Sequence, residues 1–320
     1  MRVVIIGGTG RVGTFLVPRL VMDGYEVICV SRQKSKPYRS HSAWKFVTNV
    51  AIDRTKAEEK HLFGKQIAEL NPDVIIDMIC FTLGSAKCLA EALMGQIQHF
   101  LHCGTLWVHG HSERVPTRES QPRNPFGEYG IQKAAIESYL LSLSRRKGFP
   151  ATILHPGHIT GPGWVPINPA GNLDPGIFNR LAEGKEVVLP NIGMETVHHV
   201  HADDVAQAFV NAMDNWNQAV GESFHVASEQ ALTLRGYARA MAAWRGQEAN
   251  LRFLPWEEWK KTVSREEADL TWDHIAHSTN ASIEKAKEHL KYQPRYNSLQ
   301  AVRESVKGLL SEYELKGRPS

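Results

Sequence analysis

Hydrophobic residues in the first half of the chain form short unbroken runs that alternate with longer amphipathic stretches. The runs are rich in Val and Ile and predict strands at Arg2–Ile6, Glu26–Ser31, Lys45–Val50, Val74–Met78, His99–Cys103 and Ala151–His155. The stretches between them have helical periodicity and predict helices at Val12–Met22, Lys56–Leu70, Ser85–Met94 and Glu128–Arg146. Strands without polar alternation are buried on both faces, as in a parallel sheet covered by helices. We therefore predict an α/β fold of the Rossmann type with a doubly wound parallel sheet.

The pattern becomes less regular after Pro156. Gly157–Gly171 contains several Gly and Pro residues and predicts an ordered loop. Further on, we expect a short strand at Val187–Leu189 and helices at Asn172–Glu183, Asp203–Met213, Leu232–Trp244, Glu257–Lys261, Ala281–Leu290 and Ser298–Leu310. These elements predict a dinucleotide-binding domain over residues 1–165, rejoined by about 197–228, and a smaller substrate-binding lobe from residues 166–196 and 229–320.

Composition narrows the class of protein. The chain has 320 residues, 42% of them hydrophobic, and a net charge of only +3 with scattered basic residues. Such a balance predicts neither a nucleic-acid partner nor a membrane partner. The cysteines form no CxxC pair, and we expect buried reduced thiols at Cys29, Cys80 and Cys103. With no apolar stretch of about 20 residues, the chain is expected to be cytoplasmic.

A glycine-rich turn follows the first predicted strand directly and opens a helix. Its sequence is Gly7-Gly8-Thr9-Gly10-Arg11-Val12-Gly13. Gly7 permits the tight turn, Gly10 lets backbone N–H groups approach a pyrophosphate, and Gly13 allows close packing of helix and strand. Position after a strand and before a helix is the context that this motif requires, so the turn predicts a dinucleotide site.

The end of the second predicted strand bears on the choice between NAD and NADP. An acidic residue there would bind the ribose 2′-hydroxyl, whereas a basic one can bind a 2′-phosphate. The chain has Ser31 and Arg32 at this point and no carboxylate, which favours NADP. Asp53, after the third strand, either accepts a hydrogen bond from the adenine amino group or caps a helix. We also assign Phe81, after the fourth strand, to the cofactor site.

The sequence Tyr129-Gly130-Ile131-Gln132-Lys133 places a phenol and an ammonium on one helix face. A free phenol has a pKa near 10, and a neighbouring Lys favours its ionised form. We therefore expect Lys133 to lower the pKa of Tyr129, which would act as the acid/base, and also to bind the nicotinamide ribose. Thr105 lies just past the fifth strand, where open α/β sheets bind ligands, and its hydroxyl can orient the substrate oxygen.

Taken together, these motifs resemble the extended short-chain dehydrogenases, the NAD-dependent epimerase/dehydratase family. The resemblance implies Thr105, Tyr129 and Lys133 as a catalytic triad. The segment Leu154–Gly163 is similar to the family's sixth-strand region, which implies that Pro156 and His158 contact the nicotinamide. Val200–Ala206 resembles another family segment, in which an aspartate caps the next helix. The resemblance covers nearly the whole chain.

The substrate is less well defined by the resemblance. Asn172 matches a family position that holds the diphosphate of nucleotide sugars. The arginine that such members often carry just before the segment matching Val200–Ala206 is missing, and Val197 and His198 stand in its place. This argues against a UDP-sugar and leaves a smaller polyol, sugar acid or hydroxy-ketone. We assign Thr105, Trp107, Asn172 and His199 to substrate binding, although Trp107, like Trp164, could instead belong to the core.

We expect no metal, because no Cys or carboxylate accompanies the run His198-His199-Val200-His201 at zinc-like spacing. The predicted chemistry is hydride transfer between the nicotinamide and a secondary alcohol or ketone carbon. A retained NAD would make the enzyme an epimerase, and an exchanging cofactor would make it a dehydrogenase or reductase. A non-enzymatic dinucleotide sensor or an RNA-associated protein on the same fold is the alternative. By family analogy we expect a homodimer.

Overall fold

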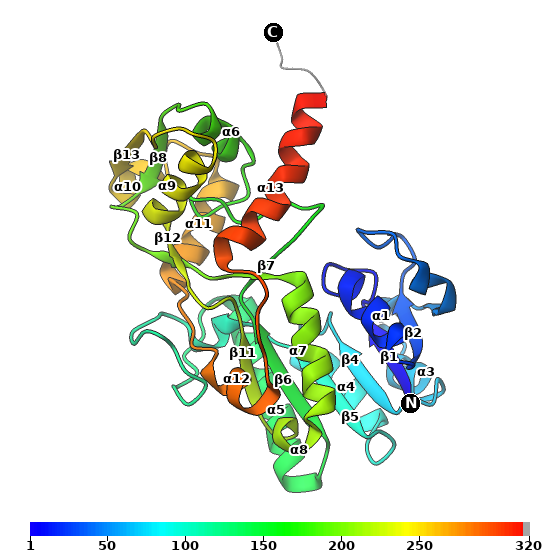
Figure 1. The fold of residues 1–320 in the computed structure, drawn as a ribbon. Coiled ribbons are helices and arrows are strands. Elements are labelled where there is room, and N and C mark those ends of the chain that lie inside the picture. Colours follow the sequence, from blue (N-terminus) through cyan, green and yellow to red (C-terminus); the bar gives the residue numbers. More distant parts are fainter. Residues whose placement is uncertain (316–320) are drawn as a thin grey trace.

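A seven-stranded parallel sheet forms the centre of the larger part of the molecule (Figure 1). The computed structural model describes the backbone of residues 1–315 and the side chains of residues 1–309. The strand order is β11-β6-β5-β4-β1-β2-β3. The strands span Arg2–Ile6 (β1), Glu26–Ser31 (β2), Thr48–Ala51 (β3), Val74–Asp77 (β4), His99–Cys103 (β5), Ala151–Pro156 (β6) and Ser223–Val226 (β11). This confirms the predicted fold class.

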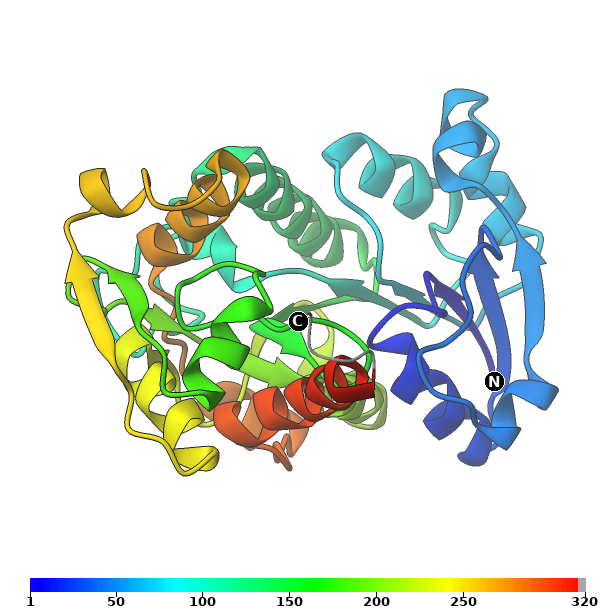
Figure 2. The same ribbon diagram turned by 90° about the horizontal axis from the view of Figure 1, so that it is seen from above.

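Helices cover both faces of the sheet (Figure 2). Alternate residues of β1 divide between two hydrophobic cores, with Val3 and Ile5 in one and Val4 and Ile6 in the other. The first core is completed by α1 (Gly13–Met22), α7 (Ala202–Asp214), α8 (Trp216–Ala219) and α12 (Glu284–Leu290). The second is completed by α2 (Arg54–Glu59), α3 (Phe63–Ala68), α4 (Leu83–Ala92) and α5 (Gly127–Lys147).

A smaller lobe packs around a third core that contains Leu189, Tyr237 and Trp259. It comprises α6 (Gly176–Ala182), β8 (Val187–Pro190), β9 (Thr196–Val197), β12 (Leu232–Thr233), α9 (Leu234–Trp244), β13 (Leu251–Leu254), α10 (Trp256–Trp259) and α11 (Arg265–His277). Between lobe and sheet, β7 (His158–Thr160) pairs in parallel with β10 (His199–His201). The last helix, α13 (Ser298–Leu315), packs on β10 and β7 and contributes to the lobe core.

Several boundaries differ from the sequence prediction for identifiable reasons. Residues Ser42–Phe46 form a 3-10 helix, so the third strand starts only at Thr48. The helix predicted over Lys56–Leu70 is two short helices, because His61 has a left-handed backbone conformation with φ of 55°. The helix predicted from Asn172 starts at Gly176.

The C-terminal segment 281–292 does not belong to the smaller lobe, contrary to our expectation. Ile283, Ala286, Leu290 and Tyr292 pack in the core of the larger unit, on the same side as α7. The cap of α7 also differs: its N-cap is His201, whose Nδ1 accepts a hydrogen bond from the backbone of Asp203. Asp203 instead pairs with Arg19.

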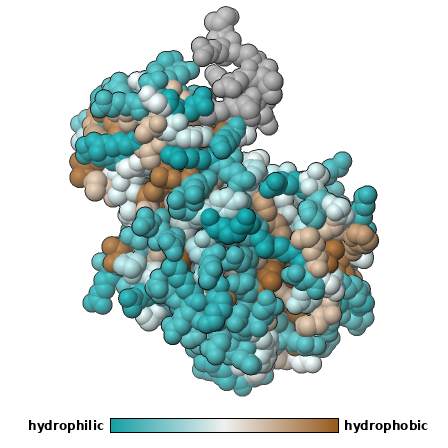
Figure 3. Space-filling view, viewed as in Figure 1, coloured by the Kyte–Doolittle hydropathy of each residue, from teal (hydrophilic) through white to brown (hydrophobic). Residues whose placement is uncertain are grey.

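The surface seen in Figure 3 is mostly hydrophilic, with hydrophobic side chains in small groups. Within the described residues, no helix is both long enough and apolar enough to cross a membrane. The four cysteines are unpaired, and those expected to be buried thiols are buried: Cys29, Cys80 and Cys103.

Candidate active site

A cavity of about 300 Å³ lies at the carboxyl ends of the central strands, where the loops after β4, β5 and β6 meet α5. This is the edge at which open α/β sheets bind ligands. Predicted site residues from five separate segments line it: Arg11, Phe81, Thr105, Trp107, Tyr129, Lys133, Pro156 and His158. The fold therefore brings most of the predicted catalytic and nicotinamide-binding residues to one place.

Lys133 is held rigidly beside Tyr129. The two residues lie one turn apart on α5, and Lys133 is only 2% exposed. Its Nζ donates to the carbonyl oxygen of Cys103 at 2.6 Å, which ties α5 to the end of β5. The same Nζ lies 5.9 Å from the ring centre of Tyr129 and 5.0 Å from that of Phe81. Tyr129, which is 42% exposed, stands at the mouth of the cavity.

The protonation of Tyr129 is set by its surroundings in the protein. Although 42% of the residue is exposed, desolvation of its hydroxyl raises the pKa of Tyr129 to about 12, and a hydrogen bond with Thr105 offsets this only in part. Burial also lowers the pKa of Lys133, whose charge is directed at the Cys103 carbonyl. In the protein alone, the pKa of Tyr129 thus lies above its usual value, and the lowering expected from Lys133 together with an oxidised nicotinamide stays a prediction. At neutral pH Tyr129 is a phenol, the form that donates a proton.

Thr105 is positioned by a buried histidine that we did not single out from the sequence. The backbone N–H of Thr105 donates to Nδ1 of His155 at 3.0 Å. A ring nitrogen that accepts carries no hydrogen, so the neutral ring has its proton on Nε2. That nitrogen lies 3.1 Å from Oε1 of Glu137, and Glu137 pairs with Arg123 at 2.7 Å. A Cβ at Gly104 would lie 2.4 Å from His155 Nδ1, which explains the glycine before Thr105.

A signal for this network was present in the sequence. Tyr129, Lys133 and Glu137 recur at four-residue intervals, and on α5 this spacing gives one continuous stripe. All three side chains thus face the sheet end that carries Thr105 and His155.

The glycine-rich turn has the geometry that a dinucleotide phosphate requires. Gly7 has φ of 88°, and a Cβ there would lie 2.8 Å from the Ile79 side chain. A Cβ at Gly13 would lie 1.9 Å from the carbonyl oxygen of Gly8, and Gly10 closes the turn by donating to Gly7 at 3.1 Å. The first turn of α1 contains no acidic residue, so nothing opposes an anion at this helix N-terminus. The residues present fit the phosphates of NAD or NADP.

Val12 and Arg11, two other predicted residues of the turn, differ in which of their groups a ligand can reach. Val12 is buried in the core, so only its backbone is available to a ligand. Arg11 lines the cavity, and its guanidinium lies 5.1 Å above the ring of Trp164. Trp164 also contacts the ring of Tyr38 edge-on at 5.1 Å. Trp164 therefore packs against the phosphate-binding turn and does not line the cavity, whereas Trp107 does. Thr9 is half-buried within the turn.

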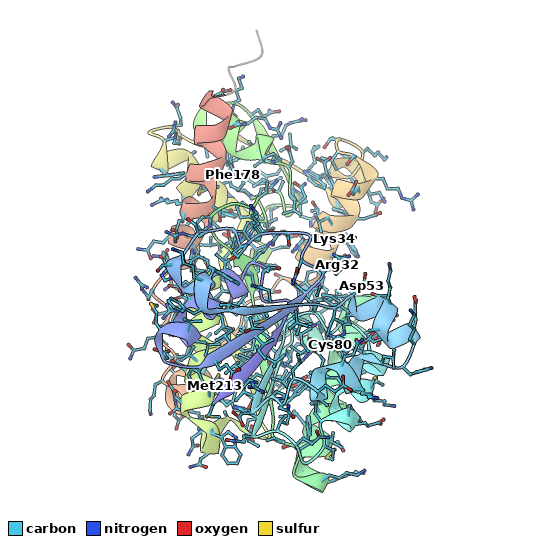
Figure 4. All side chains as sticks on the ribbon, turned by 90° about the vertical axis from the view of Figure 1, so that its right-hand side faces the viewer. Arg32, Lys34, Asp53, Cys80, Phe178 and Met213 are labelled. Atoms are coloured by element: carbon cyan, nitrogen blue, oxygen red, sulfur yellow. The ribbon has the colours of Figure 1, made fainter. Side chains whose placement is uncertain are left out.

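The residues predicted for the adenosine end lie outside the cavity, at the carboxyl ends of β2 and β3. Ser31 Oγ accepts from the backbone N–H of Gln33 at 3.1 Å. Arg32 is exposed and has no ion-pair or hydrogen-bond partner among the described residues; Figure 4 shows it near Lys34 and Asp53. Asp53 caps α2 by accepting from the backbone N–H of Lys56, which leaves its second oxygen free for another donor.

Two residues assigned to substrate binding do not reach the cavity. Asn172 is 1% exposed, and its side chain is used by Asn168, Asp174 and Thr271 in the turns before α6. His199 is fully buried and its Nε2 contacts the carbonyl oxygen of Ile167. Both assignments are therefore corrected: these side chains stabilise the lobe. No group of three or more His, Cys, Asp or Glu suited to a metal ion occurs in the described part of the chain.

Known proteins resemble the chain over most of its length. The Chloroplast stem-loop binding protein of 41 kDa b from Arabidopsis thaliana is 26% identical over 95% of this chain and 78% of its own. The 2'-dehydrokanamycin reductase of Streptomyces kanamyceticus is 26% identical over 73% of this chain and 64% of its own. A UDP-glucose 4-epimerase from Mycolicibacterium smegmatis is 26% identical over 80% of this chain and 86% of its own.

Solved structures share the fold. A UDP-glucose 4-epimerase from Thermotoga maritima, determined with UDP-glucose, superposes with a TM-score of 0.73 at 20% identity and covers 98% of this chain and 100% of its own. The family model described as "NAD dependent epimerase/dehydratase family" matches residues 3–85 and 82–227. These segments contain the glycine-rich turn, Thr105, Tyr129 and Lys133, which carried the resemblance. The chain is an enzyme of the short-chain dehydrogenase type and belongs to the NAD dependent epimerase/dehydratase family.

Proposed function

We propose that this protein is an NAD(P)-dependent oxidoreductase that moves a hydride to or from a secondary alcohol or ketone carbon of a sugar, sugar nucleotide or related polyol. The observation that carries the proposal is the convergence of Thr105, Tyr129 and Lys133 on one cavity, next to Arg11 of the phosphate-binding turn. A protein that only binds a dinucleotide needs the glycines but not this set of side chains.

Each side chain has a defined task in this reaction. The bound dinucleotide supplies or accepts the hydride. In the reducing direction, the hydride adds to the carbonyl carbon and Tyr129 donates its hydroxyl proton to the oxygen, which becomes the alcohol. Thr105 orients that oxygen by a hydrogen bond. Lys133 places a fixed positive charge beside the phenolate that remains on Tyr129 and binds the ribose.

We favour the reducing direction over epimerisation. The phenol of Tyr129, whose pKa burial raises to about 12, is the form that donates the proton in reduction. NADPH, the usual electron donor of reductases, is favoured by Ser31 at the end of β2 and by Arg32, which is exposed and has no partner within the described part of the chain. Epimerisation with a retained NAD is the alternative. Asp53 would accept from adenine, and Phe81, Pro156 and His158 would border the nicotinamide.

The test is hydride transfer in a cofactor-loaded protein. NADPH and NADH are titrated by their fluorescence, and each bound cofactor is then supplied with ketoses and with UDP- and dTDP-linked 4-keto sugars while nicotinamide oxidation is followed. We expect transfer in the unmodified protein and at least a 100-fold loss in Tyr129→Phe, with unchanged cofactor affinity. Equal rates in the two proteins would refute the proposal.

RNA binding is a second candidate function, favoured by one observation. The relative that matches 95% of this chain is named as a stem-loop binding protein. A gel-shift titration of this protein with a stem-loop RNA at several salt concentrations tests it, because phosphate contacts give affinities that fall steeply with salt. The net charge of +3 leads us to expect no such binding. We further propose that the enzyme works in the cytoplasm as a homodimer.

A further inference from the structure

One wall of the cavity is built from imidazole and indole rings. Trp107 lines the cavity, and its ring is stacked on that of His277 with centres 4.2 Å apart and planes 11° apart. The Trp107 ring is also roughly perpendicular to the rings of His274 and Tyr129, whose centres lie 5.4 Å and 5.9 Å from its own. His158, also in the lining, lies 4.9 Å from His274. Because α11 supplies both His274 and His277, the smaller lobe forms the support of this wall.

His158 presents an unused hydrogen-bond donor at this wall. Its Nδ1 accepts from the backbone N–H of His198 at 3.2 Å, so the neutral ring carries its proton on Nε2. Nε2 is buried and has no hydrogen-bond partner among the described residues. A buried donor without an acceptor is costly, and a hydroxyl or carbonyl oxygen of a ligand would satisfy it.

The wall carries no charge at neutral pH. Burial lowers the pKa of His158 well below its usual value and lowers those of His274 and His277 to about 4. No Asp or Glu occurs among the described residues that line the cavity, and its cations are Arg11 and Lys133. Arg11 belongs to the phosphate-binding turn and Lys133 donates to Cys103, so neither charge belongs to this wall.

Beside the aromatic wall, the cavity offers the diphosphate of a nucleotide sugar no cation to pair with and little space. Where nucleotide-sugar enzymes of the family often carry an arginine, this chain has the buried Val197 and His198. Both ring nitrogens of His198 are used, by the Ser228 carbonyl and by the Ala281 N–H. The cavity, at about 300 Å³, is at the lower end of the range for small-molecule sites, which is about 300–1,000 Å³, and must also admit the nicotinamide.

On the basis of the function proposed above, we propose that the substrate is an uncharged polyhydroxylated molecule of monosaccharide size, without a nucleotide, whose oxygen accepts from His158 Nε2 while its ring or chain packs on Trp107. Polyols and ketoses have this chemistry: their C–H faces pack on aromatic rings, and their oxygens accept from a neutral donor. His158, assigned by the family resemblance to the nicotinamide, becomes a substrate-binding residue.

The first experiment compares two classes of probe on protein loaded with NADPH or NADH. Fructose, sorbose and other uncharged ketoses form one class, and a UDP-linked ketose, UDP-4-keto-6-deoxyglucose, forms the other, so that both classes offer a ketone carbon to the hydride. We expect nicotinamide oxidation with an uncharged ketose, with kcat/KM at least ten-fold above that for the UDP-linked ketose. Equal or greater efficiency with the UDP-linked ketose would overturn the inference.

Variants of His158 identify the contact. His158→Phe keeps an aromatic ring and removes the donor, so KM for the ketose should rise about five-fold with little change in kcat. His158→Gln restores an N–H and should recover part of the affinity, which guards against a variant that merely folds poorly. His111→Phe is the matched control, because His111 is exposed and stacks on Phe126 outside the cavity. A KM unchanged in His158→Phe would overturn the contact.

The failures of the two proposals are distinguishable through Tyr129→Phe. UDP-sugar turnover that disappears in this variant leaves the proposed function intact and removes only the inference about the substrate. Ketose turnover that survives in the variant removes the proposed acid/base role of Tyr129, whatever the substrate.

Discussion

Replacing His155 by Leu should uncouple Thr105 from the interior of the protein. In the wild type, the fully buried ring accepts from the Thr105 N–H at 3.0 Å and contacts Glu137 at 3.1 Å. Leu can do neither, so a buried N–H is left without a partner and a carboxylate loses one donor. An unsatisfied buried donor costs about 1–3 kcal/mol and a hydrogen bond to a charged group contributes about 1.5–3 kcal/mol. After the gain from the added apolar surface, the unfolding free energy should fall by about 3 kcal/mol.

The effect on catalysis is larger than this loss of stability implies. Thr105 would no longer be held at one position relative to Tyr129, and misplacement of a reacting group by about 1 Å costs about 100-fold in rate. We expect kcat to fall by about 10- to 100-fold with unchanged affinity for the dinucleotide, whose phosphate turn is separate. Denaturant unfolding gives the stability, and hydride transfer at saturating cofactor gives kcat and KM.

The matched control is His99→Leu. His99 is also a buried strand histidine, but it lies at the opposite end of β5 and contacts Thr152 at 2.8 Å. This variant should lose about 1 kcal/mol and keep its kcat. His155→Gln, whose amide can both accept from Thr105 and donate to Glu137, should recover part of the rate. If kcat were unchanged in His155→Leu, or fell equally in His99→Leu, the positioning argument would be wrong.

Four further outcomes test the site. Gly13→Ala should weaken dinucleotide binding at least 100-fold, because its Cβ would lie 1.9 Å from the Gly8 carbonyl oxygen. The control Gly84→Ala, whose Cβ would have no atom within 4 Å, should bind the dinucleotide normally. Equal affinity in the two variants would contradict dinucleotide binding at the glycine-rich turn. Arg32→Glu should raise KM for NADPH about 10-fold or more and leave that for NADH nearly unchanged, and parallel changes would count against a 2′-phosphate site. Because burial raises the pKa of Tyr129 to about 12, the rate of reduction should be nearly independent of pH around neutrality. The rate of oxidation of the product alcohol should instead increase with pH up to that value. An oxidation rate that levels off near pH 7 would argue against this protonation state. Burial opposes ionisation of Glu137, but His155 and Arg123 outweigh burial and hold the pKa of Glu137 well below its usual value. The variant Glu137→Gln should therefore lose about 2 kcal/mol of unfolding free energy above about pH 5, and this loss should shrink as the pH falls below about 4. Denaturant unfolding across this range checks the sign, and a loss that grows with acid would refute it.

The central sheet was predictable because its strands carry an unmistakable pattern. The strands predicted at Arg2–Ile6, Glu26–Ser31 and His99–Cys103 have the same bounds in the structure, since runs of buried aliphatic residues allow little else. The glycine turn and the Tyr129–Lys133 pair were predictable for a related reason. Both depend on short-range spacing along the chain.

Two features of the site were hidden from the same reasoning. Helix α11 was not predicted, because its buried face carries Thr271, His274 and His277 among few aliphatic residues, so hydrophobic periodicity is weak there. His155 lies within an apolar strand and looks like any other interior position until β6 is paired with β5. The raised pKa of Tyr129 was hidden as well, because it comes from burial of the hydroxyl, which depends on tertiary packing and not on the spacing of Tyr129 and Lys133.

The support of the aromatic wall comes from a part of the chain that the family match leaves out. That match ends at residue 227, whereas α11 begins at Arg265. Thr105, Tyr129 and Lys133 lie inside the matched stretch together with Trp107 and His158, whereas the helix that supports Trp107 and His158 lies outside it. Exchange of this one helix between relatives would reshape the support of the wall without altering Thr105, Tyr129 or Lys133, which offers one route by which a common scaffold diversifies into enzymes of different specificity.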